Sequence, residues 1–334
     1  MSPRPLRVPL TSTRTAPRPT YALLWLVGTV LTACSTSPAP RHPRPALPLP
    51  QALVDNFALT APVSAPEFGP AGGDRDAIYW RGSLRCADEV ATFHVLTPRD
   101  LPPRPLVVCL PILAGGADLM RQVAGGLARR GFAAAWVDRA GAAMRGEQRT
   151  PELETLFRRT VCQYRMLLRW AARRADLFAP AQRGLLGLST GGIVGSVLLA
   201  IEPGVAAGAL CLAGADLPSL LLASQETRVV GWRRWRTEAD GLAGAGLQRD
   251  LERELAVDPA HFGAYVASER VLLMHAAFDN VVPSRQHHLL WECLGRPRDL
   301  RVPLGHYSAA LALDPILDAI ASFCADRFAV VAGA

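Results

Sequence analysis

The sequence predicts an α/β domain with a mostly parallel sheet of about eight strands and helices on both of its faces. Apolar runs of strand length alternate with segments of helical length from about residue 74 to the end of the chain. Most of these runs lack alternating polar positions, which is typical of parallel strands covered on both faces. The chain has 334 residues, 50% of them hydrophobic, so it can bury a core of this size.

Eight segments have the composition of strands. The second alternates apolar and polar residues roughly one by one, as a half-exposed strand does, and the next five are nearly continuous apolar runs. The last is shorter. In chain order, we expect strands at Asp76–Gly82, Val90–Pro98, Pro105–Leu110, Phe132–Val137, Gly184–Leu188, Val205–Ala213, Arg270–Ala276 and Leu300–Leu304.

Helices are expected between these strands, and two of them carry clear end signals. Gly131 stands where a glycine commonly ends a helix, and Pro151 stands in a first turn, where proline is tolerated. The expected helices are Leu119–Arg130, Pro151–Asp176, Gly191–Ile201 and Pro315–Phe328, with a further amphipathic helix around His287 and His288.

The interval 214–267 interrupts the alternation and has helical stretches of its own, so we expect a cap inserted over the sheet edge after the sixth strand. Trp232 and Trp235 alternate with arginines in this segment. Such a pattern is typical of an amphipathic helix that covers its own core; contact with a lipid headgroup region or with an acyl chain is the alternative.

The first 33 residues have the layout of a signal peptide. Four arginines and no acid precede the uncharged run Tyr21–Ala33, which at thirteen residues is shorter than the roughly 20 that a membrane-spanning helix needs. The run ends in Leu-Thr-Ala-Cys-Ser, which resembles the bacterial lipobox. That resemblance implies that Cys34 is lipidated and that the exported protein is anchored at the cell envelope; Ser35 favours the periplasmic face of the outer membrane.

Residues 34–73 are expected to form a proline-rich tether, because residues 35–50 contain six prolines. We therefore place the start of the folded domain near Asp74, which gives a signal peptide at 1–33, a tether at 34–73 and a folded domain at 74–334.

Charge and cysteine content exclude some classes of function. The formal charge of +7 falls to +3 once residues 1–33 and their four arginines are removed, and no zinc-type spacing of cysteine and histidine is present, so we expect no nucleic-acid partner. Six cysteines follow Cys34. Cys109 and Cys211 lie inside apolar runs, where cysteine usually acts as a small hydrophobe, so we expect at most one or two disulfides.

The segment Gly187-Leu188-Ser189-Thr190-Gly191 has the pattern Gly-x-Ser-x-Gly between an expected strand and an expected helix. A strand that turns directly into a helix crowds the backbone around the serine, and residues without a β-carbon leave the needed space. The turn would present the Ser189 hydroxyl at the carboxyl edge of the sheet, although a glycine-rich loop with an incidental serine has the same pattern.

A serine hydroxyl becomes a nucleophile when a base takes its proton and a third group orients that base. His306 lies on a loop after the last expected strand. Two acids lie on loops that leave strands: Asp279 after the seventh and Asp216 after the sixth.

From about Asp74 to the end, the chain resembles the α/β-hydrolase superfamily. The resemblance rests on the order Ser189, Asp279, His306 and on the segments Phe-Asp-Asn-Val-Val-Pro and Gly-His-Tyr around the acid and the base. It implies that Ser189 attacks an acyl carbon, that His306 moves the proton and that Asp279, rather than Asp216, holds the imidazole.

The resemblance also implies an oxyanion hole made of two backbone N–H groups and no metal or organic cofactor. Thr190 is expected to supply one donor. The other is expected from the loop after the third strand, where Ile112 and Leu113 are the candidates and we choose Leu113; the familiar His-Gly pair is replaced there by Pro-Ile.

The expected function is hydrolysis of an ester or thioester through an acyl-enzyme, with a small-molecule or lipid-like acyl substrate. The alternative is a non-catalytic envelope lipoprotein that uses the hydrolase scaffold for binding. Loss of turnover on replacing Ser189 distinguishes the two.

Overall fold

The computed structural model describes residues 35–36, 43–99, 103–113, 115–138, 144 and 147–333. The expected signal peptide at 1–33 and the expected lipidation site Cys34 lie outside the described residues.

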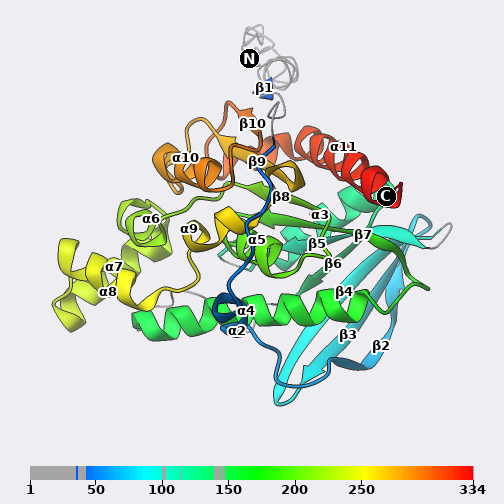
Figure 1. Ribbon diagram of the computed structural model, residues 1–334, viewed down its shortest axis with the longest axis horizontal. Coiled ribbons are helices and arrows are strands. Elements are labelled where there is room, and N and C mark those ends of the chain that lie inside the picture. Colours follow the sequence, from blue (N-terminus) through cyan, green and yellow to red (C-terminus); the bar gives the residue numbers. More distant parts are fainter. Residues whose placement is uncertain are drawn as a thin grey trace, which may run out of the picture.

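In the described part of the chain, ten strands form one sheet in the order β1-β10-β9-β8-β7-β5-β6-β4-β3-β2 (Figure 1). The six strands from β5 to β10 pair in parallel and the other four in antiparallel. All eight expected strands are present, so the prediction of a mostly parallel α/β sheet is confirmed. The strands are β1 (Ser35–Thr36), β2 (Ser64–Gly73), β3 (Ala77–Cys86), β4 (Glu89–Pro98), β5 (Arg104–Leu110), β6 (Ala133–Val137), β7 (Phe178–Leu188), β8 (Ala207–Cys211), β9 (Val271–Ala276) and β10 (Arg298–Val302).

Helices cover both faces of the sheet, and each face has its own hydrophobic cluster. Successive residues of β5 point to opposite sides: Leu106 and Val108 join the cluster under α4 and α5, whereas Val107 and Cys109 join the cluster under α3 and α11. This is why the apolar runs show no alternation. The helices outside the interval 214–267 are α2 (Gln51–Asp55), α3 (Ala117–Arg129), α4 (Thr150–Ala171), α5 (Thr190–Ile201), α10 (Ser284–Cys293) and α11 (Leu313–Ala332).

The segment Ser308–Ala332, which includes α11, is long and apolar enough to cross a membrane by composition alone. It packs instead against the sheet and α3 in this fold, with Leu317, Ile320 and Phe323 in the second hydrophobic cluster. The helix therefore closes the domain, as the sequence predicts.

The packed part of the chain begins earlier than the expected start near Asp74. Phe57 is 1% exposed, and β2 pairs with β3 as an edge strand. Phe68 of β2 stacks on Trp80, with ring centroids 5.4 Å apart. The sequence did not indicate β2, because its prolines and glycines are typical of a loop. An edge strand tolerates proline, whereas a central strand does not.

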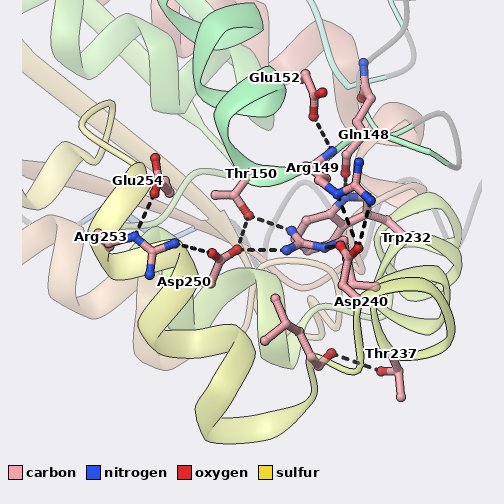
Figure 2. A network of polar contacts seen from close by, with 12 residues as sticks. Gln148, Arg149, Thr150, Glu152, Trp232, Thr237, Asp240, Asp250, Arg253 and Glu254 are labelled. Carbon is pink, nitrogen blue, oxygen red and sulfur yellow. Dashed lines mark hydrogen bonds and ion pairs between the residues drawn. The ribbon is translucent and has the colours of Figure 1, made fainter.

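Between β8 and β9 the chain forms the helices α6 (Leu217–Ala223), α7 (Thr227–Asp240), α8 (Gly244–Glu254) and α9 (Pro259–Phe262). A polar network fastens this segment to the start of α4 (Figure 2). The buried Arg236 donates to Thr150 Oγ1, Asp250 Oδ2 and Asp240 Oδ2, at 2.6, 2.9 and 2.8 Å. We call these four side chains the cap network.

Trp232 is 1% exposed and its Nε1 donates to the carbonyl oxygen of Gln148 at 2.7 Å (Figure 2). Trp235 is half-buried and packs against the main hydrophobic cluster. Of the two interpretations of the tryptophan–arginine pattern, the structure therefore favours a helix that covers its own core over one that contacts lipid.

The six cysteines after Cys34 are all free thiols in this structure. The sequence led us to expect at most one or two disulfides among them, and they form none. Burial raises the pKa of Cys211 and Cys324 to about 12. These thiols stay protonated at neutral pH and serve as small hydrophobes between the sheet and α11.

Candidate active site

Ser189 is the single residue between the end of β7 at Leu188 and the start of α5 at Thr190, at the carboxyl edge of the sheet. Its backbone has φ 53° and ψ −117°, a conformation that residues with side chains rarely adopt. Its N–H donates to the carbonyl oxygen of Cys211 in β8 at 2.8 Å, which ties the turn to the sheet. The turn predicted from Gly-x-Ser-x-Gly is therefore present.

Two glycines make this turn sterically possible. A β-carbon at Gly187 would lie 2.3 Å from the carbonyl oxygen of Gly191, and one at Gly191 would lie 2.2 Å from the carbonyl oxygen of Leu110. Real β-carbons do not approach oxygen so closely, so any other residue at either position would force the turn open.

The structure brings Ser189, His306 and Asp279 together in one chain of contacts. His306 Nε2 lies 3.0 Å from Ser189 Oγ, and His306 Nδ1 lies 2.7 Å from Asp279 Oδ2. Ser189 and His306 are each 8% exposed, and the Asp279 side chain is 5% exposed. Water screens these contacts little.

Asp279 has separate partners for its two carboxylate oxygens. Oδ1 accepts hydrogen bonds from the backbone N–H groups of Val281 and Val282, each at 2.8 Å, and Oδ2 faces His306. A carboxylate can only accept, so His306 carries its proton on Nδ1. Its Nε2 lone pair is then directed at the hydroxyl of Ser189, which is the arrangement that a general base requires.

The loops that carry the acid and the base leave the neighbouring strands β9 and β10. The Phe278 N–H donates to the carbonyl oxygen of Leu304 at 2.9 Å, and the Ala277 N–H donates to the carbonyl oxygen of Val302 at 2.8 Å. Gly305 donates to Ser308 Oγ at 2.9 Å, which closes the turn around His306. Backbone bonds therefore fix the relative position of the loops that carry Asp279 and His306.

Asp216, the rival acid, is not in contact with His306. Its side chain accepts a hydrogen bond from the Ser219 N–H at 3.3 Å and caps α6. Asp258 in turn accepts from the Asp216 and Leu217 N–H groups. Asp216 thus has a structural role at the start of the segment 214–267.

A mainly apolar cavity of about 200 Å³ opens beside Ser189 and His306. Its wall includes Leu113, Leu188, Leu212, Met274 and Ile316, with Glu226 as its acidic member. Leu113 and Thr190, the two expected oxyanion donors, both lie on a second, smaller cavity that also reaches Ser189. Thr190 is the first residue of α5, so its N–H belongs to the positive end of that helix.

Sequence reasoning missed Glu226 and Tyr307 as cavity residues. Glu226 comes from the segment 214–267 and accepts a hydrogen bond from the Val229 N–H at 2.9 Å, which caps α7. Tyr307 is largely exposed, but partial desolvation, together with the charges of Glu226 and Asp279, raises its pKa. The Gly-His-Tyr segment could have pointed to Tyr307, whereas nothing local distinguishes Glu226 from other helix-capping acids.

No family model and no curated protein matches this sequence. Solved structures do match in fold. Acetyl xylan esterase 1 from Thermoanaerobacterium sp. JW/SL YS485 is 14% identical, with a TM-score of 0.57 over 80% of this chain and 92% of the other. The acetyl xylan esterase from Paenibacillus sp. R4 is also 14% identical, with a TM-score of 0.58 over 81% and 92%. The 2,6-dihydroxy-pseudo-oxynicotine hydrolase is 19% identical, with a TM-score of 0.55 over 76% and 68%. The chain has the α/β-hydrolase fold that these proteins share.

Proposed function

We propose that this protein is a serine hydrolase that cleaves an ester or thioester through an acyl-enzyme. The contact chain from Ser189 through His306 to Asp279 is the observation that carries the proposal. Each of its members lies where the chemistry needs it: a nucleophile on a strained turn, a base within hydrogen-bond distance and an acid that fixes the tautomer of the base.

In the proposed reaction, Ser189 Oγ attacks the acyl carbon while His306 Nε2 takes the hydroxyl proton. The oxyanion that forms would be stabilised by the backbone N–H of Thr190 and by that of Leu113. The imidazolium then protonates the leaving alcohol or thiol, and Ser189 keeps the acyl group. A water molecule, activated by the same Nε2, releases the acid and restores the hydroxyl.

The cavity supports a short, apolar acyl group as the substrate class. A volume of about 200 Å³ is below the range of roughly 300–1,000 Å³ in which drug-sized ligands bind. Its wall offers aliphatic side chains and the Glu226 carboxylate, so we expect neutral acyl groups to be preferred over anionic ones. Two of the fold relatives are acetyl xylan esterases by name, which agrees with a small acyl group.

The test is a series of p-nitrophenyl esters from acetate to palmitate, with the wild type, Ser189→Ala and Ser196→Ala. Ser196 lies in α5, the helix that follows Ser189, and donates to the carbonyl oxygen of Ile193 at 2.7 Å, which makes it a matched serine outside the contact chain. We expect kcat/KM to be highest for acyl groups of about two to six carbons, to fall at least about 10⁴-fold in Ser189→Ala and to persist in Ser196→Ala.

Equal rates for Ser189→Ala and the wild type would contradict the proposal. A folded wild-type protein without turnover on any ester of the series would favour a binding role for the scaffold instead.

A further inference from the structure

A cluster of two histidines and one aspartate lies outside the active site, where β9, α10 and β10 meet. His275 is on β9, His287 on α10 and Asp299 on β10. Their side chains are 20%, 8% and 20% exposed. The potential ligand atoms, one from each residue, all lie within 4.8 Å of one another. The contact chain of Ser189 does not include any of the three.

Both ring nitrogens of His287 face hydrogen-bond acceptors. Nδ1 lies 3.3 Å from the carbonyl oxygen of Ala213, and Nε2 lies 3.3 Å from Asp299 Oδ1. A neutral imidazole has one N–H, so it satisfies one of these contacts and turns a lone pair to the other acceptor. When Nδ1–H donates to Ala213, the Nε2 lone pair and Asp299 Oδ1 face each other, and a bound metal ion can join two such donors.

The backbone contact favours a metal ion. Metal-binding histidines commonly donate their second N–H to a carbonyl oxygen, which fixes the tautomer and directs the other lone pair at the metal. The carbonyl oxygen of Ala213 is placed to accept a hydrogen bond from His287 Nδ1–H, which leaves Nε2 as the ligand. His275 presents Nδ1 to the same carboxylate, at 3.2 Å from Oδ1 and 3.1 Å from Oδ2.

The distances from the two histidine nitrogens to the Asp299 carboxylate agree with a tetrahedral site, and the three donor atoms all lie within 4.8 Å of one another. Zinc–nitrogen and zinc–oxygen bonds of about 2.0–2.1 Å at tetrahedral angles place neighbouring ligand atoms about 3.3 Å apart. The nitrogen–oxygen distances in the cluster are 3.1–3.3 Å. We propose that His275, His287 and Asp299 bind one divalent transition-metal ion of the zinc class.

The fourth coordination position opens to solvent. The cluster lines an open cavity of about 590 Å³ whose wall also contains Arg285 and Arg301. Water or a small anion can complete the shell from that side, and the two guanidinium groups favour an anion. Imidazole nitrogen is a poor ligand for Mg²⁺ and Ca²⁺, so these ions are not expected to bind.

Metal binding would brace the loop that carries Asp279. This loop runs from the end of β9 to the start of α10, so His275 and His287 lie just before and just after it in the chain. An ion bound to both residues, and to Asp299 of β10, links the two ends of the loop to the sheet. We expect the ion to stabilise the protein without taking part in the reaction at Ser189.

The test uses the purified full chain, stripped of metal by a chelator, with Zn²⁺ as the probe. Isothermal titration calorimetry is expected to give one site per chain, and Tm to rise by about 5 °C at a hundredfold excess of free Zn²⁺ over Kd. Co²⁺ in place of Zn²⁺ is expected to give the visible absorption of a tetrahedral site.

Asp299→Asn and His275→Gln are expected to weaken Zn²⁺ binding at least about 100-fold. His288→Gln is the matched control, because His288 lies on the same helix and the same cavity but its ion-pair partner is Glu292 at 3.7 Å. His306→Ala controls for binding at the active-site histidine, and circular dichroism checks that each variant folds. Absence of Zn²⁺ binding, or binding that survives both cluster substitutions, would overturn the proposal.

Discussion

Of the two candidate acids, Asp279 contacts His306 and Asp216 does not. Both carboxylate oxygens of Asp279 are engaged, and the two backbone N–H groups that hold Oδ1 leave Oδ2 for His306. Asp216, the other candidate acid in the sequence, caps α6 instead. The difference lies in which loop approaches His306, because backbone bonds join the loops after β9 and β10.

Asp279→Asn is expected to lower kcat by about 10⁴-fold with little change in fold. The asparagine can keep its oxygen on Val281 and Val282, but its amide then faces His306 Nδ1 as a donor. The imidazole would move its proton to Nε2 and could no longer accept the proton of Ser189. Steady-state kinetics on the best ester of the series measures the effect.

Asp216→Asn is the control for this prediction, since asparagine also caps helices well. We expect its kcat to stay within about twofold of the wild type. A larger loss of kcat in Asp216→Asn than in Asp279→Asn would contradict the assignment of Asp279 as the residue that orients His306.

Candidate residues that are marked by their neighbours in the sequence could be predicted from it. Ser189 is marked by its glycines, and Asp279 and His306 by their positions after strands. The cluster of His275, His287 and Asp299 could not be predicted, because an apolar strand makes His275 look like a core residue and an amphipathic helix makes His287 look ordinary. Only the packing of α10 against β9 and β10 brings the three side chains together.

Among the secondary-structure elements, the turn between β7 and α5 sets the position of Ser189, the proposed nucleophile. Its strained backbone at Ser189 persists because the glycines allow the helix to begin directly beside β5 and β8. The sequence predicts this element well, since its requirements are local. The sequence does not predict β2, because the residues of β2 lack the apolar pattern of a strand and form one by pairing with β3.

Gly191→Ala is expected to lower the free energy of unfolding by about 3 kcal/mol and to reduce kcat/KM, because the new β-carbon would collide with the backbone of Leu110. Gly125→Ala is the matched control: Gly125 lies in α3, where the nearest neighbour of an added β-carbon would be Arg129 Nη1 at 3.7 Å. There we expect stabilisation by about 0.5–1 kcal/mol. Chemical denaturation measures both, and equal destabilisation of the two variants would refute the steric argument.

The cap network is the second element whose role can be tested. Arg236→Met is expected to lower the free energy of unfolding by about 3 kcal/mol, because it leaves the carboxylates of Asp240 and Asp250 without their buried partner. Arg253→Gln removes the exposed partner of the same Asp250 and is expected to change stability by less than about 0.5 kcal/mol. Similar losses in denaturant unfolding would show that burial of Arg236 has no special effect.

Across the full chain, we propose separate tasks for the folded domain and the N-terminal segment. The domain supplies the proposed chemistry, whereas residues 1–33 and Cys34 carry the signal from which we propose export and attachment to the cell envelope. The fold class could be predicted from the alternation of apolar runs and helices. The start of the packed domain could not, because a proline-rich segment that packs and one that is free have the same composition.

Cys34→Ala is expected to abolish incorporation of labelled palmitate and to release the protein from the membrane fraction of an expressing bacterium. Its ester hydrolysis should equal that of the wild type, because Cys34 has no part in the proposed reaction. Cys162→Ala, a half-buried free thiol, is the control. Labelling of Cys34→Ala at the wild-type level would contradict lipidation at this residue.

The most direct test of the proposed function is mass spectrometry of the full chain after reaction with a fluorophosphonate probe. We expect one adduct per chain, located on Ser189 and lost in Ser189→Ala. Labelling should be strongly slowed in Asp279→Asn and as fast as in the wild type in Ser196→Ala. A folded protein without an adduct, or with an adduct on another residue, would contradict the assignment of Ser189 as an activated nucleophile.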